Sequence, residues 1–320
     1  MELKPQDARL LSYLYHHARE PSTKIAKALG LTREQVDYKI KKFMSEGIIK
    51  QFTTLFNYPA FGYKEYRILL LKFAKPIYAK NFFQKQGKEK NLLDIAFISN
   101  KYDLVMELFF RDEKEFREHL NKLLNEQKEK ISDYFVFNYY YGKIWPLKFL
   151  DEKKEEGVLF NQEIKEVSLD KQEIQILKML AEDGRERIVE IADKLKISPE
   201  LALYKIKKLR ERKLILSSAI IFDMKKLGYF LSTILINIQN FSAENEKKIK
   251  DFAEKSGHVR SIVLSVSKPN CFIQLFHKEH GDFIKTIDEI KELFKNDFVD
   301  VDVLFVDYPE KEKINTLPFL

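Results

Sequence analysis

Apolar residues recur at helical spacing in the segment that begins near residue 172, where Ile174, Leu177 and Leu180 would share one face of a helix. A second, shorter helix is predicted over 188–194. The third begins at Ser198, whose hydroxyl suits an N-cap and is followed by a proline, which the first helical position tolerates. With the strand-like residues that come next, the pattern predicts three helices followed by a hairpin.

The same order of elements occurs at the start of the chain. Thr32 stands at the N-cap position of a third helix, and Gly47 ends that helix, because glycine accepts the left-handed backbone common at helix C-termini. Residues Ile48–Phe56 then alternate as a strand does. We therefore expect a second set of three helices and a hairpin here.

The segment that follows residue 230 has a different pattern. Strands are predicted over Thr233–Ile238, Arg260–Val266, Phe272–Phe276 and Val299–Val306, and helices over Ala243–Lys255 and Asp282–Phe294. In Val299–Val303 apolar and acidic residues alternate strictly, which is typical of an antiparallel strand with one wet face. The order β-α-β-β-α-β predicts a ferredoxin-like domain.

The chain repeats itself. When it is shifted by 166 residues, Leu3–Tyr63 aligns with Leu169–Tyr229 without a gap, and 19 of the 61 positions are identical. Tyr38–Lys42 and Tyr204–Lys208 form the longest identical run. Beyond residue 63 the shift becomes 167, and the helical face of Phe116, Leu120 and Leu123 falls on Phe283, Ile287 and Ile290. We interpret the chain as a tandem duplication.

The positive charge is concentrated in the two helical segments. The 320 residues carry a net charge of +7, and residues 1–63 and 167–229 each contribute +4, which leaves −1 for the remainder. A basic surface of this kind favours an anionic partner. The three-helix segments are therefore the parts expected to bind it.

Several classes of protein are excluded by composition and motif. A lone cysteine, Cys271, allows neither an internal disulfide nor a multi-cysteine metal site, and apolar runs fall far short of the ~20 residues of a membrane helix. The sequence shows no phosphate-binding glycine loop and no nucleophile elbow. We expect a soluble cytoplasmic protein that is not an enzyme, has no metal or cofactor and does not enter membranes.

The recurring Lys-Ile-Lys-Lys motif, Lys39–Lys42 and Lys205–Lys208, lies on the third helix of each set. Taken alone, such a motif is the solvated face of a helix. Its recurrence after a short helix and a turn favours a helix-turn-helix, whose second helix enters the major groove of double-stranded DNA. The DNA-binding residues that we predict are Thr32, Arg33, Gln35, Tyr38, Lys39, Lys41, Lys42, Ser198, Tyr204, Lys205, Lys207 and Lys208.

These residues resemble a known family. The similarity to the Lrp/AsnC (leucine-responsive regulatory protein) family is carried by Leu169-Asp170, Ile176-Leu177, Leu180, Arg185, Glu190-Ile191-Ala192, Leu195, Ile197-Ser198, Lys205–Leu209, Leu214-Ile215, Phe222-Asp223 and Leu227-Gly228. The resemblance implies a transcription regulator in which a winged helix-turn-helix is joined to a ferredoxin-like ligand-sensing domain. Members usually have one such unit and dimerise, so two units in one chain resemble a covalent pseudo-dimer, which could assemble further with other copies.

The resemblance and the repeat together predict an α+β protein with a division into five segments. These are a winged helix-turn-helix (1–63), a ferredoxin-like sensing domain (64–150), a charged linker (151–166), a second winged helix-turn-helix (167–229) and a second sensing domain (230–320). The two third helices differ at the positions that would face bases, with Gln35, Asp37 and Tyr38 in one and Leu201, Ala202 and Leu203 in the other. We expect them to read different half-sites, or the second to contact backbone only.

The family's effector loop commonly reads Gly-x-Tyr-Asp, and the first unit has a similar sequence from Asn100 to Asp103. By resemblance, Asn100, Tyr102 and Asp103 are candidates for binding a small amino-acid-like effector. The simpler interpretation is a hairpin turn in which the Asn and Asp side chains bond locally. We prefer the turn, because the glycine is missing and the second unit has Ser267–Asn270 instead.

Two other functions remain open. Siroheme decarboxylases resemble the same architecture, and they would need a large pocket between the units lined by His and Arg. The ferredoxin-like segments hold few of either residue. The other alternative is an architectural module whose helical segments bind protein or DNA without sequence specificity.

Overall fold

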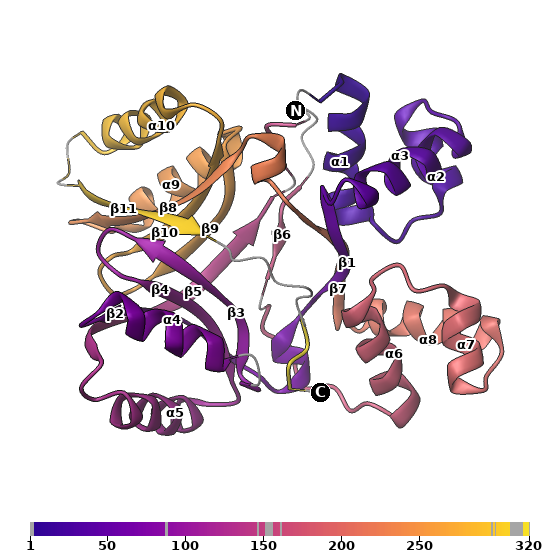
Figure 1. Cartoon of the computed structure of the whole chain (residues 1–320), viewed down its shortest axis with the longest axis horizontal. Helices are drawn as coiled ribbons and strands as arrows, with labels where there is room; N and C mark the ends of the chain where they lie inside the picture. The colour runs from indigo at the N-terminus through magenta and orange to yellow at the C-terminus, as the bar shows by residue number, and fades with distance from the viewer. Residues whose placement is uncertain are drawn as a thin grey trace.

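The computed structural model describes residues 3–86, 89–145, 147–150, 156–160, 162–295, 297, 299–307 and 316–319. Helices and antiparallel strands are combined as the α+β class requires, which confirms the fold class. Figure 1 shows two three-helix heads on one side of the molecule and the large sheet with its helices on the other. Within the described residues, no helix combines the length and the apolar character needed to cross a membrane.

The first head contains α1 (Pro5–His17), α2 (Ser22–Leu29) and α3 (Arg33–Ser45). The predicted N-cap of α3 is confirmed: the Thr32 hydroxyl accepts the Gln35 amide, and the Gln35 side chain accepts the Thr32 amide. This reciprocal capping box satisfies two amides that the helix leaves unpaired. The boundary of α3 is therefore encoded locally.

The second head contains α6 (Lys171–Glu182), α7 (Ile188–Leu195) and α8 (Pro199–Glu211). Ser198 caps α8 as predicted, accepting a hydrogen bond from the amide of Leu201. The turn before α8 needs a left-handed residue, which is Lys196 (φ 53°), whereas the first head has Gly30 (φ 67°) at the equivalent place. The turn conformation is thus kept even where glycine is lost, at the cost of a strained lysine backbone.

The hairpin expected in each head is wrong. The strand after α3 is β1 (Ile49–Phe56), and the strand after α8 is β7 (Ile215–Phe222). These two pair with each other, antiparallel, as a separate two-stranded sheet. Each strand finds its partner in the other head because the next residues turn through short 3-10 helices (Tyr58–Phe61 and Lys225–Leu227) into the large sheet.

The pairing of β1 with β7 is symmetric with respect to the sequence repeat. Thr53 faces Ala219, which is the residue 166 positions later and therefore its own equivalent. On either side, Phe52 faces Ile220, which is the repeat equivalent of Thr54, and Thr54 faces Ser218, which is the repeat equivalent of Phe52. The two heads are thus related about an axis that passes between Thr53 and Ala219.

The large sheet has nine strands. They are β2 (Glu65–Phe73), β3 (Leu92–Ser99), β4 (Leu104–Phe110), β5 (Ile131–Ile144), β6 (Val158–Leu159), β8 (Phe230–Ile238), β9 (Val259–Ser265), β10 (Cys271–His277) and β11 (Val299–Asp307). Their order is β2-β4-β3-β11-β8-β10-β9-β5-β6, and β2 also pairs with β5. This last pairing closes eight of the strands into a ring, to which β6 is appended.

The ring is made of two ferredoxin-like sheets. One has the order β5-β2-β4-β3 and the other the order β11-β8-β10-β9, as the predicted β-α-β-β-α-β pattern requires. They join where β3 pairs with β11 and where β5 pairs with β9. Ile98 faces Val306 at one seam and Ser265 faces Tyr139 at the other, which are equivalent pairs at the shift of 167. Closure leaves the eight strands without an unpaired edge.

Four helices cover the outside of the ring, as Figure 1 shows: α4 (Pro76–Lys85) and α5 (Glu113–Glu126) on the first sheet, α9 (Ala243–Lys255) and α10 (His280–Leu293) on the second. Each pair has its own apolar core. The inside of the ring is filled by side chains such as Phe137 and Phe272, whose rings lie 6.0 Å apart. The ring is therefore a packed core and not an open channel.

Segments that follow each sheet return to the head of the other unit. Phe149 packs on Tyr229 with ring centroids 4.4 Å apart, and Phe319 packs on Tyr63 at 3.9 Å. The predicted linker is only partly free of structure, because Val158 and Leu159 form β6 against the end of β5. Residues 151–155 of that linker lie outside the described residues.

Gly184 lies where the heads meet, and this position generates a prediction. Its amide donates to the carbonyl of Phe52, and a Cβ atom built on it would lie 2.1 Å from the Thr53 carbonyl oxygen. Gly184→Ala should therefore lower the free energy of unfolding by about 1–3 kcal/mol, through overpacking against backbone. Urea denaturation followed by circular dichroism measures this loss.

The matched control is Gly257→Ala, because a Cβ atom at Gly257 meets nothing within 4 Å. This control should unfold at the same urea concentration as the parent protein. Equal stability of the two variants would contradict the close contact between the heads.

Candidate nucleic-acid interface

The helices predicted to face DNA, α3 and α8, leave one side of each exposed. Tyr38 is 68% exposed and its equivalent Tyr204 is 56% exposed, while Val36 and Ala202 are buried in the heads. Leu201 and Leu203 of α8 are also exposed. An aromatic side chain this exposed on both helices gains nothing from burial in its own head and is free to contact a partner.

Lys39 and Lys205 do not extend freely from these helices. Lys39 forms an ion pair with Asp7 of α1, and Lys205 pairs with Asp170, the N-cap of α6, at 2.6 Å. Both lysine side chains are more than four-fifths buried. Each joins the third helix of its head to the first, so both have a structural role whether or not they reach DNA.

The other lysines of the motif are more exposed. Lys41 has an exposed side chain and no ion pair among the described residues, and Lys207 lies 3.9 Å from Glu211 with three-quarters of its side chain exposed. Lys42 lies 3.8 Å from Glu46. Lys208 donates to Glu211 at 2.8 Å, and this bond raises its pKa. Such exposed pairs are weak and can exchange for phosphates.

The residues at the start of the third helices are occupied with capping. Thr32, Gln35 and Ser198 all hold the helix ends described above. Arg33 is exposed and lies 3.6 Å from Asp37, which also accepts a hydrogen bond from Ser22 at 2.5 Å. Asp37 is thus held within its own head.

The candidate effector residues separate into two groups. Asn100 adopts φ 97° and donates to the carbonyl of Val303, and Asp103 accepts from Lys72 and from the Phe73 amide at 2.7–2.9 Å. These are the bonds of a turn held to its neighbours. Tyr102 is buried, and burial raises the pKa of its phenol.

Tyr102 lines a cavity of about 220 Å³ between the two sheets, together with Lys101, Lys268, Asp300 and Asp302. Lys268 is the repeat equivalent of Lys101, so both units contribute to it. The Lys101 ammonium donates to Asp302 at 2.8 Å, and this bond raises its pKa. Asn100 and Asp103 do not line this cavity.

A larger cleft of about 1170 Å³ lies between the heads, and the sequence did not indicate it. Four arginines line it: Arg19 after α1, Arg185 and Arg187 between α6 and α7, and Arg210 of α8. Arg19 and Arg185 are one of the identical pairs of the repeat, which was the available signal. Their proximity depends on the pairing of β1 with β7, which the sequence pattern did not predict.

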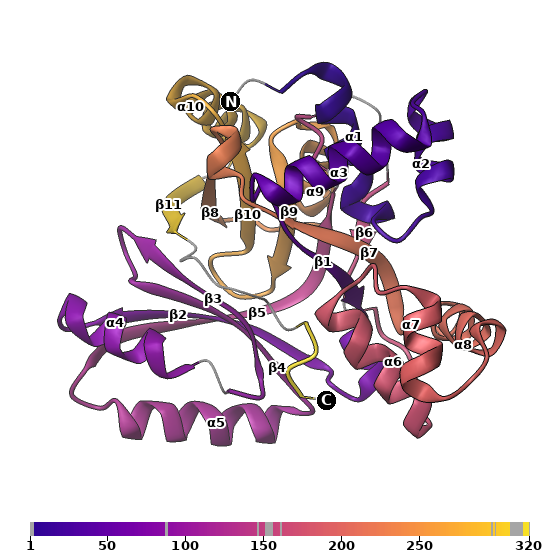
Figure 2. The same cartoon turned by 45° about the vertical axis from the view of Figure 1, so that its right-hand side comes forward.

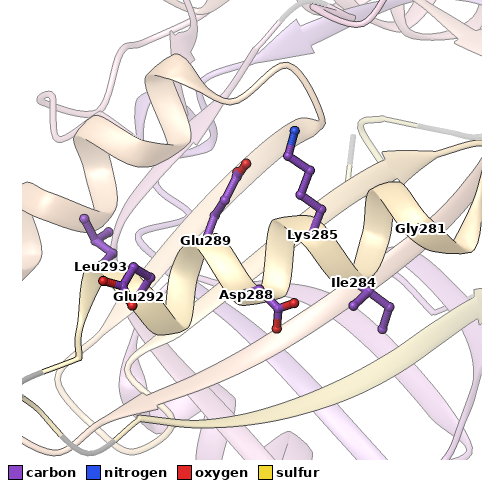
Figure 3. Close-up of a pocket in the computed structure, with 7 residues that line it drawn as sticks. All are labelled: Gly281, Ile284, Lys285, Asp288, Glu289, Glu292 and Leu293. Atoms are coloured by element: carbon purple, nitrogen blue, oxygen red, sulfur yellow. The ribbon is translucent and has the colours of Figure 1, made fainter.

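The hollow along α10 has no comparable chemistry. Figure 3 shows that its labelled residues all come from this helix, with Lys285 and Glu289 on one side and Ile284 and Asp288 on the other. Its polar side chains do not converge on a common point, so we assign it no binding role.

The comparison with protein families agrees with the second helical head. Residues 169–215 match the family described as winged helix-turn-helix DNA-binding. The HTH-type transcriptional regulator FL11 of Pyrococcus abyssi is 25% identical over 115 residues, covering 36% of this chain and 76% of that protein. AldR of Mycobacterium tuberculosis, also an HTH-type transcriptional regulator, is 23% identical over 126 residues, covering 39% and 70%. HTH-type transcriptional regulators are therefore relatives of this chain.

A solved structure resembles the fold of nearly the whole chain. The crystal structure of the siroheme decarboxylase NirDL, in complex with an iron-uroporphyrin III analogue, superposes with a TM-score of 0.65. The match covers 98% of this chain and 95% of that chain at 14% identity. The arrangement of two heads and a closed sheet is thus shared with another protein.

The ion pairs of Lys39 and Lys205 lead to a prediction. Lys39→Ala and Lys205→Ala should each lower the free energy of unfolding by about 1 kcal/mol, because each removes one partner of a part-buried ion pair. Chemical denaturation at low and high salt measures the loss. If stability is unchanged in both variants, the two lysines do not hold the first and third helices together.

Proposed function

We propose that the chain is a DNA-binding transcription regulator of the Lrp/AsnC type that acts as an intramolecular pseudo-dimer. The observation that carries the proposal is the pairing of β1 with β7 about Thr53 and Ala219. It relates the two heads as the subunits of a symmetric dimer are related. The helix-turn-helix match and the relatives among transcriptional regulators supply the class of function.

The fixed relation of the heads suits a two-part DNA site. In dimeric helix-turn-helix proteins the two recognition helices enter successive major grooves, about 34 Å apart on one face of the duplex. In this chain the ring, the β1–β7 sheet and the reciprocal packing of Phe149 and Phe319 all oppose independent movement of the heads. The chain would therefore bind two half-sites without a second copy.

Phosphate and base contacts fall to different residues in this proposal. Lys41, Lys42 and Lys207 have the exposure needed to neutralise phosphates. Tyr38, Tyr204 and Leu201 would face the groove, where apolar side chains contact thymine methyl groups. Because Leu201 replaces Gln35 in the second head, the two half-sites would differ in sequence.

The fold shared with NirDL makes tetrapyrrole chemistry the rival proposal. The cavity between the two sheets measures about 220 Å³, below the roughly 300–1,000 Å³ typical of pockets for drug-sized ligands. A tetrapyrrole is larger than such ligands. Of the two cavities between the repeats in the described part of the chain, only the cleft of about 1170 Å³ between the heads, which His16, His17 and several arginines line, has the volume for a tetrapyrrole. The regulator is favoured over the enzyme by the helix-turn-helix match and by the relatives among transcriptional regulators.

Removing the exposed lysines tests the proposal. The double variant Lys41→Ala/Lys207→Ala should bind duplex DNA more weakly at every sequence. The slope of log K against log salt should fall by about 0.9 for each phosphate that the protein no longer neutralises. Fluorescence anisotropy of a labelled duplex over a range of salt concentrations measures both quantities.

The control is Lys247→Ala/Lys285→Ala, which removes the same charge from exposed positions on α9 and α10. This control should keep the affinity and slope of the parent protein. Absence of DNA binding at low salt, or an equal reduction of the slope in both double variants, would reject the assignment of the heads.

We further propose that the cavity between the sheets binds a small amino-acid-like effector. Carboxylates of Asp300 and Asp302 and ammonium groups of Lys101 and Lys268 line the same small space. A zwitterion offers the complementary charges to both groups. Tyr102 would close one wall, whereas Asn100 and Asp103 would only hold the turn.

Thermal unfolding with each of the standard amino acids tests this site. A ligand that binds only the folded state raises the melting temperature with concentration. We expect one or a few amino acids to do so, and Lys268→Ala to abolish the effect while Lys80→Ala on α4 does not. A shift that survives Lys268→Ala would refute the site.

A further inference from the structure

The cleft between the heads is built from both repeats. One wall comes from the end of α1 and the start of α2, and the other from α7 and α8, with Ser217 and Ser218 of β7 between them. Figure 2 shows the two heads side by side with β1 and β7 between them. At about 1170 Å³ the cleft has room for a small organic molecule.

Of the four guanidinium groups in this cleft, that of Arg187 lies 3.3 Å from Glu190. The other three, of Arg19, Arg185 and Arg210, have no carboxylate partner within ion-pair distance among the residues that the structure describes. Arg19 donates to the carbonyl oxygen of Gly184 at 2.9 Å, and Arg185 lies over the ring of Phe52 at 5.2 Å. The Nη1 atom of Arg185 is buried and has no hydrogen-bond partner among the described residues. Arg210 is exposed at the rim.

The electrostatics of the cleft are unfavourable without a ligand. Burial, followed by the positive charge of Arg210, lowers the pKa of Arg19 to about 10, and burial also lowers the pKa of Arg185. Both guanidinium groups stay protonated at neutral pH. The folded state therefore still carries the free-energy cost of burying them and of placing like charges close together.

Nearby acids relieve part of this cost: the charges of Asp183 and Glu186 act to raise the pKa of Arg19, and those of Asp37 and Asp183 act to raise the pKa of Arg185. Asp183 accepts the backbone amide of Arg185 at 2.8 Å, and Asp37 accepts from Ser22. Glu20 pairs with Lys24 at 2.6 Å, and Glu186 pairs with Lys194 at 2.6 Å. Glu156 lines the cleft but is exposed. Among the described residues none of these carboxylates lies within ion-pair distance of the three guanidinium groups, so a ligand could still pair with them directly.

We propose that this cleft binds a small organic anion that carries several phosphate or carboxylate oxygens. Arginine presents a planar fork of donors that matches both groups, and a buried, unpaired Nη1 atom is a donor already desolvated. The ligand would bridge Arg19 of the first head to Arg185 and Arg210 of the second.

Such a ligand would act on the heads directly, because it contacts both of them next to the β1–β7 sheet. Its binding does not depend on DNA, so the site stands whether or not the chain is a transcription regulator. If the heads do bind DNA, the ligand would favour one relation between them and so one spacing of half-sites.

Isothermal titration of the full chain at low salt, without DNA, tests the proposal with two probes, inorganic tripolyphosphate and citrate. We expect one probe to bind with a stoichiometry of one, and the preferred probe distinguishes phosphate from carboxylate ligands. Arg210→Gln and Arg185→Met should each raise the dissociation constant about tenfold, the effect of one charge-assisted hydrogen bond. Arg210 is exposed, so its variant keeps the fold.

The control is Arg117→Gln on α5, which removes an exposed arginine far from the cleft in sequence and should bind as the parent protein does. Failure of both probes to bind would overturn the proposal, as would equal weakening in Arg117→Gln. If neither probe binds but Arg185→Met and Arg210→Gln lose affinity for duplex DNA, the arginines belong to the DNA interface and the small-anion site is rejected.

Discussion

The antiparallel pairing of β1 with β7 is the interaction on which the rest of the molecule depends. Because Thr53 faces its own repeat equivalent, Ala219, the surroundings of one head are approximately repeated around the other. The Thr54 hydroxyl donates to the carbonyl of Leu180, and the amide of Arg19 donates to the Ser218 hydroxyl, so the first helices are bound to the strand of the opposite head. Neither head is complete without the other strand.

The closed ring of strands also fixes the two repeats relative to each other, on the side of the molecule away from the heads. Two ferredoxin-like sheets would each leave two edge strands open, and pairing β3 with β11 and β5 with β9 removes all four. The single chain makes this pairing intramolecular, which lowers its entropic cost and makes it independent of protein concentration. The heads and the ring therefore hold each other in one arrangement.

Local features could be predicted from the sequence, and non-local partners could not. The caps at Thr32 and Ser198 and the bounds of α9 depend on neighbouring residues, and all were predicted. The strand Ile49–Phe56 was also predicted, but alternation does not say which strand it pairs with, and the expected hairpin was wrong. For the same reason the motif suggested DNA contacts for Lys39 and Lys205 without revealing their ion pairs with Asp7 and Asp170. The cleft of Arg19 and Arg185 required the strand pairing first.

The central claim is that one chain presents two DNA-binding heads at a fixed separation. Hydroxyl-radical footprinting on a selected duplex, combined with the mass of the complex from sedimentation, tests it most directly. The account predicts one 38.1 kDa chain per duplex and two protected patches on one face, about one helical turn apart. A single protected patch, or two chains required for two patches, would contradict it.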